Sequence, residues 1–132
     1  MGFEEIPHTA DWAIRVWSED LAGLLVASAL GMYALSGAKQ ARVPRVTRRL
    51  EVEGVDAEGM LVAFLSELAY LAEQENTAFD RFDIQLKDDR LNVEMQGAPL
   101  KSLSKAIKAV TYHNLKIEHT ERGMEAVIVF DV

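Results

Sequence analysis

Residues 46–76 read VTRRLEVEGVDAEGMLVAFLSELAYLAEQEN, and this stretch decides the fold class. In its first part Val46, Leu50 and Val52 share one side while charged residues occupy the other, which is typical of a strand with one face in water. After Asp56, a residue type that favours a helix N-cap, apolar residues recur at spacings of three and four. The stretch therefore predicts a half-exposed strand (about 42–55) that passes directly into an amphipathic helix (about 57–76).

The rest of the chain continues this mixture of strands and helices. Alternating residues predict strands over about 12–17, 81–87, 91–96, 108–119 and 124–132, and a second helix starts at 18–20 and ends near Gly37. Residues 87–90 suit a hairpin turn, residues 121–123 a second turn, and residues 99–104 a loop. The order lacks the strand–helix–strand rhythm of parallel sheets. We predict one α+β domain over residues 1–132, with a largely antiparallel mixed sheet and two main helices packed on one face.

Composition narrows the classes of function. The 132 residues include 14 Lys and Arg against 21 Asp and Glu, which gives a formal net charge of −7. Such a surface repels phosphate backbones, so a protein that coats nucleic acid is disfavoured. The chain has no cysteine, which excludes disulfides, cysteine zinc sites and thiol nucleophiles.

Neither a secretory signal nor a membrane span is expected. The first five residues, Met1 to Glu5, are acidic where a signal peptide needs positive charge. Residues 21–38 carry no charge but are rich in alanine, glycine and serine, which favours a buried helix packed closely on a sheet over a span. We expect a cytoplasmic protein without a membrane partner.

Three polar clusters are candidates for chemistry. His8-Thr9-Ala10-Asp11 precedes the first predicted strand, and its ordinary interpretation is a turn. Asp131 interrupts an apolar strand one residue before Val132. If the natural chain ends there, two adjacent carboxylates favour a hard cation such as Ca²⁺, Mg²⁺ or Mn²⁺, although a solvated, frayed end is by itself the simpler explanation.

The third cluster is the segment Ile107-Lys108-Ala109-Val110-Thr111-Tyr112-His113. Lys108 could hold a phosphate or neutralise carboxylates, and His113 could bind a metal or transfer protons near neutral pH. A plain strand with polar residues remains the alternative. Four arginines within residues 42–49 could meet RNA or an acidic partner, but the exposed face of a strand explains them as well. The chain has no P-loop, dinucleotide-binding glycine motif, HExxH or GxSxG sequence.

Together, the HTAD sequence at 8–11, the IKAVTYH sequence at 107–113 and the final Asp131-Val132 resemble the archease family over essentially the whole chain. This resemblance implies a small protein cofactor of the RtcB-type RNA-splicing ligase, one that promotes guanylation of the ligase and repeated turnover in tRNA ligation. It implies that the protein is not itself an enzyme and reaches tRNA indirectly, through the ligase. The family's metal site maps onto Asp11 and Asp131 with Val132 as a further oxygen donor, and its functional lysine maps onto Lys108. His8 belongs to the same motif.

Two other functions remain open at this point. A metal-dependent hydrolase or nuclease would use Asp11, Asp131 and His113, but the chain lacks a convincing nucleophile or a second set of carboxylates. A chaperone-like modulator of RNA-modifying proteins would rest on the arginines at 42–49 and on exposed apolar surface.

Overall fold

The computed structural model describes residues 1–7 and 12–132. Its first sheet, here the terminal sheet, joins strands from both ends of the chain. Strands β1 (Gly2–Ile6), β2 (Trp12–Ser18), β9 (Gly123–Asp131) and β7 (Ala109–Val110) lie side by side in that order, and β8 (Glu118–Thr120) also pairs with β9. Each of these pairings is antiparallel. Strands more than a hundred residues apart in sequence are thus direct neighbours.

The second sheet, here the hairpin sheet, is built around β6 (Arg90–Ser102). This strand pairs antiparallel with β5 (Thr77–Lys87), β4 (Val46–Glu53) and the short β3 (Lys39–Gln40). The β5–β6 hairpin and the alternation in β4 match the residues that predicted them. Val52 of β4 is buried in the core, whereas Thr47, Arg49, Glu51 and Glu53 are exposed. One face of this strand is therefore in contact with solvent, as the sequence indicated.

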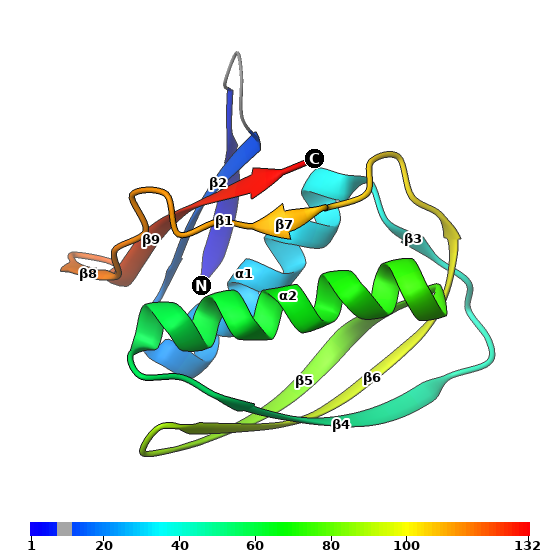
Figure 1. Ribbon diagram of the computed structural model, residues 1–132, viewed down its shortest axis with the longest axis horizontal. Coiled ribbons are helices and arrows are strands. Elements are labelled where there is room, and N and C mark those ends of the chain that lie inside the picture. Colours follow the sequence, from blue (N-terminus) through cyan, green and yellow to red (C-terminus); the bar gives the residue numbers. More distant parts are fainter. Residues whose placement is uncertain (8–11) are drawn as a thin grey trace.

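Two helices occupy the space between the sheets (Figure 1). Helix α1 (Leu21–Ser36) packs against β1, β2 and β5, and helix α2 (Ala57–Glu75) against β4, β5 and β7. Local sequence sets their ends. The side chains of Asp20 and Asp56 accept hydrogen bonds from the third residue beyond each, at 2.8 and 2.7 Å, and Gly37 closes α1 in the left-handed conformation with φ 67°.

The hydrophobic core is one continuous cluster that both helices and both sheets share. Leu24 and Leu25 of α1, Phe64 and Leu68 of α2, and Phe130 of β9 are each at most 1% exposed. Phe64 also meets Phe82 of β5 edge to face, with ring centroids 5.9 Å apart. The helical layer therefore holds the two sheets together.

The predicted α+β class, with antiparallel strands and two main helices, is confirmed, and the helices cover the inner face of each sheet. The strands form two sheets, however, where the sequence led us to expect one. Strand β1 was not predicted, because only Phe3 and Ile6 give its short segment an apolar pattern.

Four predicted elements are wrong in extent. The strand at 81–87 begins four residues earlier, at Thr77. The loop at 99–104 is largely strand, because β6 continues through Pro99 to Ser102. The strand at 108–119 reduces to β7 and β8, since the chain turns at 112–115, where Leu115 N–H bonds to Tyr112 O and Asn114 has φ 52°. The strand at 42–55 begins only at Val46, after Pro44, which has no N–H to donate to a ladder. Within the described residues, no helix is long and apolar enough to cross a membrane.

Candidate functional site

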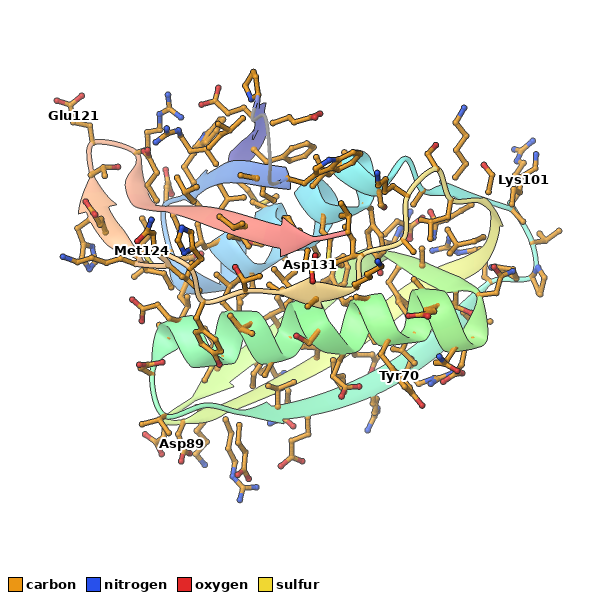
Figure 2. All side chains as sticks on the ribbon, turned by 45° about the horizontal axis from the view of Figure 1, so that its top comes forward. Tyr70, Asp89, Lys101, Glu121, Met124 and Asp131 are labelled. Atoms are coloured by element: carbon orange, nitrogen blue, oxygen red, sulfur yellow. The ribbon has the colours of Figure 1, made fainter. Side chains whose placement is uncertain are left out.

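The candidate site lies where β9 ends. Phe130 pairs with Trp12 of β2 on one side and with Val110 of β7 on the other. Asp131 is the next residue, and its backbone oxygen accepts a hydrogen bond from the Lys108 N–H at 2.8 Å. Figure 2 shows Asp131 at the end of this strand, beside β7. The end of β9 is thus held between two other strands rather than frayed.

The alternation of β9 decides the environment of Asp131. Ala126, Ile128 and Phe130 point into the core and are 4%, 0% and 1% exposed, whereas Asp131 is exposed. A carboxylate at this position stays in contact with water, so no desolvation penalty arises. The ion pairs among the described residues do not involve Asp131.

Lysines border this strand end. Lys108 is exposed, and its backbone is fixed by the bond to Asp131. Lys105, which the sequence analysis did not single out, places its Nζ atom 5.0 Å from the centre of the Trp12 ring. An ammonium at that distance is attracted by the ring face. The spacing of lysines at 101, 105 and 108 was the available sequence signal for this feature.

The other predicted site residues differ in where they lie. His113 is exposed in the turn after β7, where its N–H bonds to Thr111 Oγ1 at 3.3 Å, and no hydrogen bond joins it to Asp131 or Lys108. Val132 is partly buried and packs against the core. His8 and Asp11 lie outside the described residues, so the predicted convergence of Asp11 with Asp131 remains a prediction.

The donors that the structure describes do not by themselves make a metal centre. Within residues 1–7 and 12–132, no group of three His, Asp or Glu side chains is placed to hold a cation. Asp131 supplies one hard oxygen donor of the type that Ca²⁺ and Mg²⁺ prefer. A cation site here therefore requires oxygen donors other than the His, Asp and Glu side chains of that part of the chain.

The acidic residues of the described chain whose pKa values are shifted lie away from Asp131. A two-bond contact with Arg45, at 2.7 and 3.0 Å, lowers the pKa of Asp80, and a similar contact with Arg48, at 2.6 and 3.2 Å, lowers the pKa of Glu75. Arg49 meets Glu94 at 3.3 Å. Most of the arginine cluster at 42–49 is thus neutralised by acids on the hairpin sheet and α2. Its interpretation as the wet face of a strand holds for Arg49 alone, because Arg42 and Arg45 precede β4 and Arg48 shares the side of Val46 and Leu50.

A hollow of about 510 Å³ lies on the outer face of the hairpin sheet, away from Asp131. Its walls are mostly polar residues of β4, β5 and β6, among them the Arg49–Glu94 pair, together with Leu50 and Val93. Because charged side chains standing on a solvated strand face leave such spaces between them, its volume alone does not mark a binding site.

These features define a class: a small α+β protein whose first and last long strands meet, with a carboxylate and lysines at that junction. The archease protein family model matches residues 3–132. The chain belongs to the archease family.

Individual relatives agree with this assignment. The chain is 32% identical to a protein archease of Methanopyrus kandleri over 140 residues, which covers 100% of both proteins. It is 32% identical to that of Pyrococcus furiosus over 129 residues, or 92% of this chain and 91% of the relative.

Two solved structures share the fold. The solution structure of a Methanobacterium thermoautotrophicum protein aligns with TM-score 0.70 at 25% identity, over 99% of each chain. The crystal structure of an archease, a possible chaperone, from Thermotoga maritima aligns with TM-score 0.71 at 22% identity, over 98% of this chain and 96% of that one.

Proposed function

We propose that this archease is a non-catalytic protein cofactor of an RtcB-type RNA ligase, and that it promotes guanylation of the ligase and multiple turnover in tRNA ligation. Membership of the archease family supports this role. The observation that carries it is the position of Asp131, an exposed carboxylate without an ion-pair partner among the described residues, beside the backbone of Lys108.

The proposed cation site combines Asp131 with Asp11, and with an oxygen of Val132. Support comes from the register of the terminal sheet. Trp12 pairs with Phe130, and Asp11 is the residue before Trp12 in the sequence, as Asp131 is the residue after Phe130. Because consecutive Cα atoms are about 3.8 Å apart, the chain enters β2 close to where it leaves β9. His8, from the same sequence motif, is proposed to assist at this site.

In this proposal the protein supplies ligands and charge rather than a nucleophile. A divalent cation would neutralise the phosphates of GTP for nucleotidyl transfer. Asp131 and Asp11 would orient that cation through their carboxylate oxygens, and Lys108 would hold a phosphate oxygen with its ammonium. His113 forms no hydrogen bond with Asp131 or Lys108, so we give it a role at the contact with the ligase.

The test is guanylation of an RtcB-type ligase by GTP, with and without this protein. The Asp131→Asn variant keeps the shape of the side chain but removes its charge, and Lys108→Gln removes the amine. We expect each to reduce the stimulation by about tenfold or more, as loss of groups around a metal commonly does. Calcium titration by calorimetry should show weaker binding for Asp131→Asn.

A matched control is Glu121→Gln, which removes one exposed carboxylate from the turn between β8 and β9, at the far end of the terminal sheet (Figure 2). This variant should stimulate the ligase as the wild type does. A folded Asp131→Asn protein with full stimulation would show that the strand end does not act in this way. Hydrolysis of phosphodiesters by the purified protein alone would favour the hydrolase alternative instead.

A further inference from the structure

Strand β4 forms an open edge of the hairpin sheet. Its only strand partner among the described residues is β6, with which it pairs from Val46 to Glu53. Apart from that ladder, the hydrogen bonds of the described residues do not use the backbone of residues 46–53. Because alternate residues of an edge strand turn their N–H and C=O groups away from the sheet, β4 presents a row of backbone donors and acceptors to solvent. Figure 1 shows β4 along the lower border of the molecule.

Two other outer strands carry features that oppose pairing with another chain. Strand β1 has only five residues, of which Glu4 and Glu5 are acidic. The register of β5 is interrupted at Asp80. Strand β4, by contrast, has eight residues, no proline and a continuous register. Short strands, bulges and prolines are the usual protection of a sheet edge, so β4 is the least protected of these three strands.

The side of β4 that faces the core is only partly covered at this edge. Val46 and Leu50 are half-buried, whereas Val52 is 6% exposed. Helix α2 packs against β5 and β6 as well as β4, so it lies over the sheet and leaves the outer edge of β4 free. Arg48, the charged residue on this side, is already held by Glu75. A second strand beside β4 would therefore bury more of Leu50 without meeting an unpaired charge there.

The solvent side of β4 carries charges in an order that complements itself. Its residues are Thr47, Arg49, Glu51 and Glu53. When two β4 strands pair antiparallel with Leu50 at the centre, Arg49 of each copy lies opposite Glu51 of the other, which gives two attractive cross-strand pairs. A centre at Arg49 or at Glu51 places two like charges opposite each other. A shift of half that size sets inner side chains against outer ones. The charges therefore favour one register.

Arg49 is free to make this contact. Its side chain is 86% exposed, the highest value among the ion pairs of the described residues, and it meets Glu94 at 3.3 Å. Glu51 is held on one side by Arg90 at 2.9 Å. In the paired arrangement a row of alternating charges would run from Glu94 and Arg49 of one copy to Glu51 and Arg90 of the other. Such networks contribute more than isolated surface pairs.

We propose that two copies of this chain associate through β4, in antiparallel pairing centred on Leu50, so that their hairpin sheets become one continuous sheet. The dimer has two-fold symmetry, and each contact occurs twice. One strand per copy is a small contact beside the about 1,200 Å² or more of a standard interface, so the dimer dissociates on dilution. Asp131 ends a strand of the terminal sheet, on the opposite side of the molecule, so both copies keep that strand end accessible (Figure 1).

The test is sedimentation equilibrium of the full-length chain between about 10 μM and 1 mM, a range in which weak interfaces associate. The wild type should pass from monomer towards dimer. Arg49→Glu alone should remain monomeric, because its carboxylate would face Glu51 of the other copy, and Glu51→Arg alone should remain monomeric because it would face Arg49. An equal mixture of the two variants should dimerise, since every one of these cross-strand pairs is then opposite in charge.

Arg81→Glu is the matched control. It makes the same change of charge at an exposed position on the same face of the hairpin sheet, but in β5, and it should dimerise as the wild type does. Amide hydrogen exchange locates the contact: as the concentration rises, alternate amides of residues 46–53 should exchange more slowly, because their outward N–H groups gain partners.

Three results would overturn the proposal. The first is a wild-type protein that stays monomeric over the whole concentration range. The second is a dimer that Arg49→Glu leaves intact, or an equal mixture of the two variants that does not associate. The third is protection from exchange on β1 or β5 in place of β4. None of these results bears on stimulation of the ligase, which the proposed function assigns to the other sheet.

Discussion

At the scale of single residues, Gly97 shows how one missing side chain shapes the hairpin sheet. It lies in β6 between Val46 of β4 and Phe79 of β5. A Cβ atom at this position would lie 2.0 Å from the backbone oxygen of Ala78 and 2.8 Å from the Cα of Phe79. Because both obstacles are backbone atoms, no side-chain rotation can make room. Glycine is required here for close approach of the strands.

We therefore expect Gly97→Ala to destabilise the protein by about 2–3 kcal/mol, at the upper end of what overpacking commonly costs. The free energy of unfolding in urea measures this. Gly59→Ala in α2 is the control, since its Cβ would meet only the end of the Asp56 side chain at 3.0 Å and Tyr112 at 3.9 Å. It should be neutral or gain up to about 1 kcal/mol from helix propensity. Equal stability of the two variants would contradict the close-approach argument.

At the scale of elements, an irregularity in β5 connects the hairpin sheet to its edge. The pairing of β5 with β6 shifts between Phe79 and Arg81, so Asp80 is the extra residue. It meets Arg45 just before β4, and Glu75 at the end of α2 meets Arg48 within β4. Two arginines thus join β4 to the elements on either side of Asn76.

These contacts predict a pH effect. The pKa values of Asp80 and Glu75 lie below their ordinary range because each carboxylate accepts hydrogen bonds from an arginine. A carboxyl whose folded pKa is lowered stabilises the fold above its unfolded pKa, about 4, and this contribution is lost as the pH falls through the folded value.

The Arg45→Gln, Arg48→Gln variant should therefore melt below the wild type at pH 7, and the difference should shrink below about pH 4. Thermal unfolding from neutral to acidic pH measures this. Arg49→Gln is the control, because Arg49 is 86% exposed with a single contact, and its effect should be small at every pH. A difference that stays constant with pH would argue against the ion pairs as its cause.

The accuracy of the sequence analysis also depended on the element. Both helices were predicted within a residue or two, since their caps, Asp20, Gly37 and Asp56, act through neighbours in sequence. The break between β7 and β8 and the extension of β6 depend on partners far along the chain, which local alternation does not contain. The exposed carboxylate of Asp131 was found from its unusual place in an apolar strand.

At the scale of the whole molecule, the shared core makes the two sheets one unit. Phe64 is fully buried in α2, between the sheets, and contacts Phe82 of the hairpin sheet. Truncation to alanine should cost about 3–5 kcal/mol, the usual loss for a buried phenylalanine. Both sheets should lose stability together, because neither has a core of its own.

The measurement uses one probe for each sheet. Fluorescence of Trp12 and Trp17 reports the terminal sheet, and amide exchange at Leu91 and Val93 reports the hairpin sheet. In Phe64→Ala the two should give the same reduced free energy of unfolding. Tyr70→Ala, which removes a 57% exposed side chain from the same helix, should change it by less than about 0.5 kcal/mol. Separate transitions for the two sheets would contradict a single unit.

The pairing of β2 with β9 has a consequence for biosynthesis. On the ribosome, β2 emerges early, but the neighbour that pairs with it from Trp12 to Ser18 is made more than a hundred residues later. Until then one edge of β2 has no partner, and an open strand edge is prone to pair with other chains. Asp131 belongs to that later strand, so a nascent protein cannot engage a partner through this carboxylate before β9 has been made.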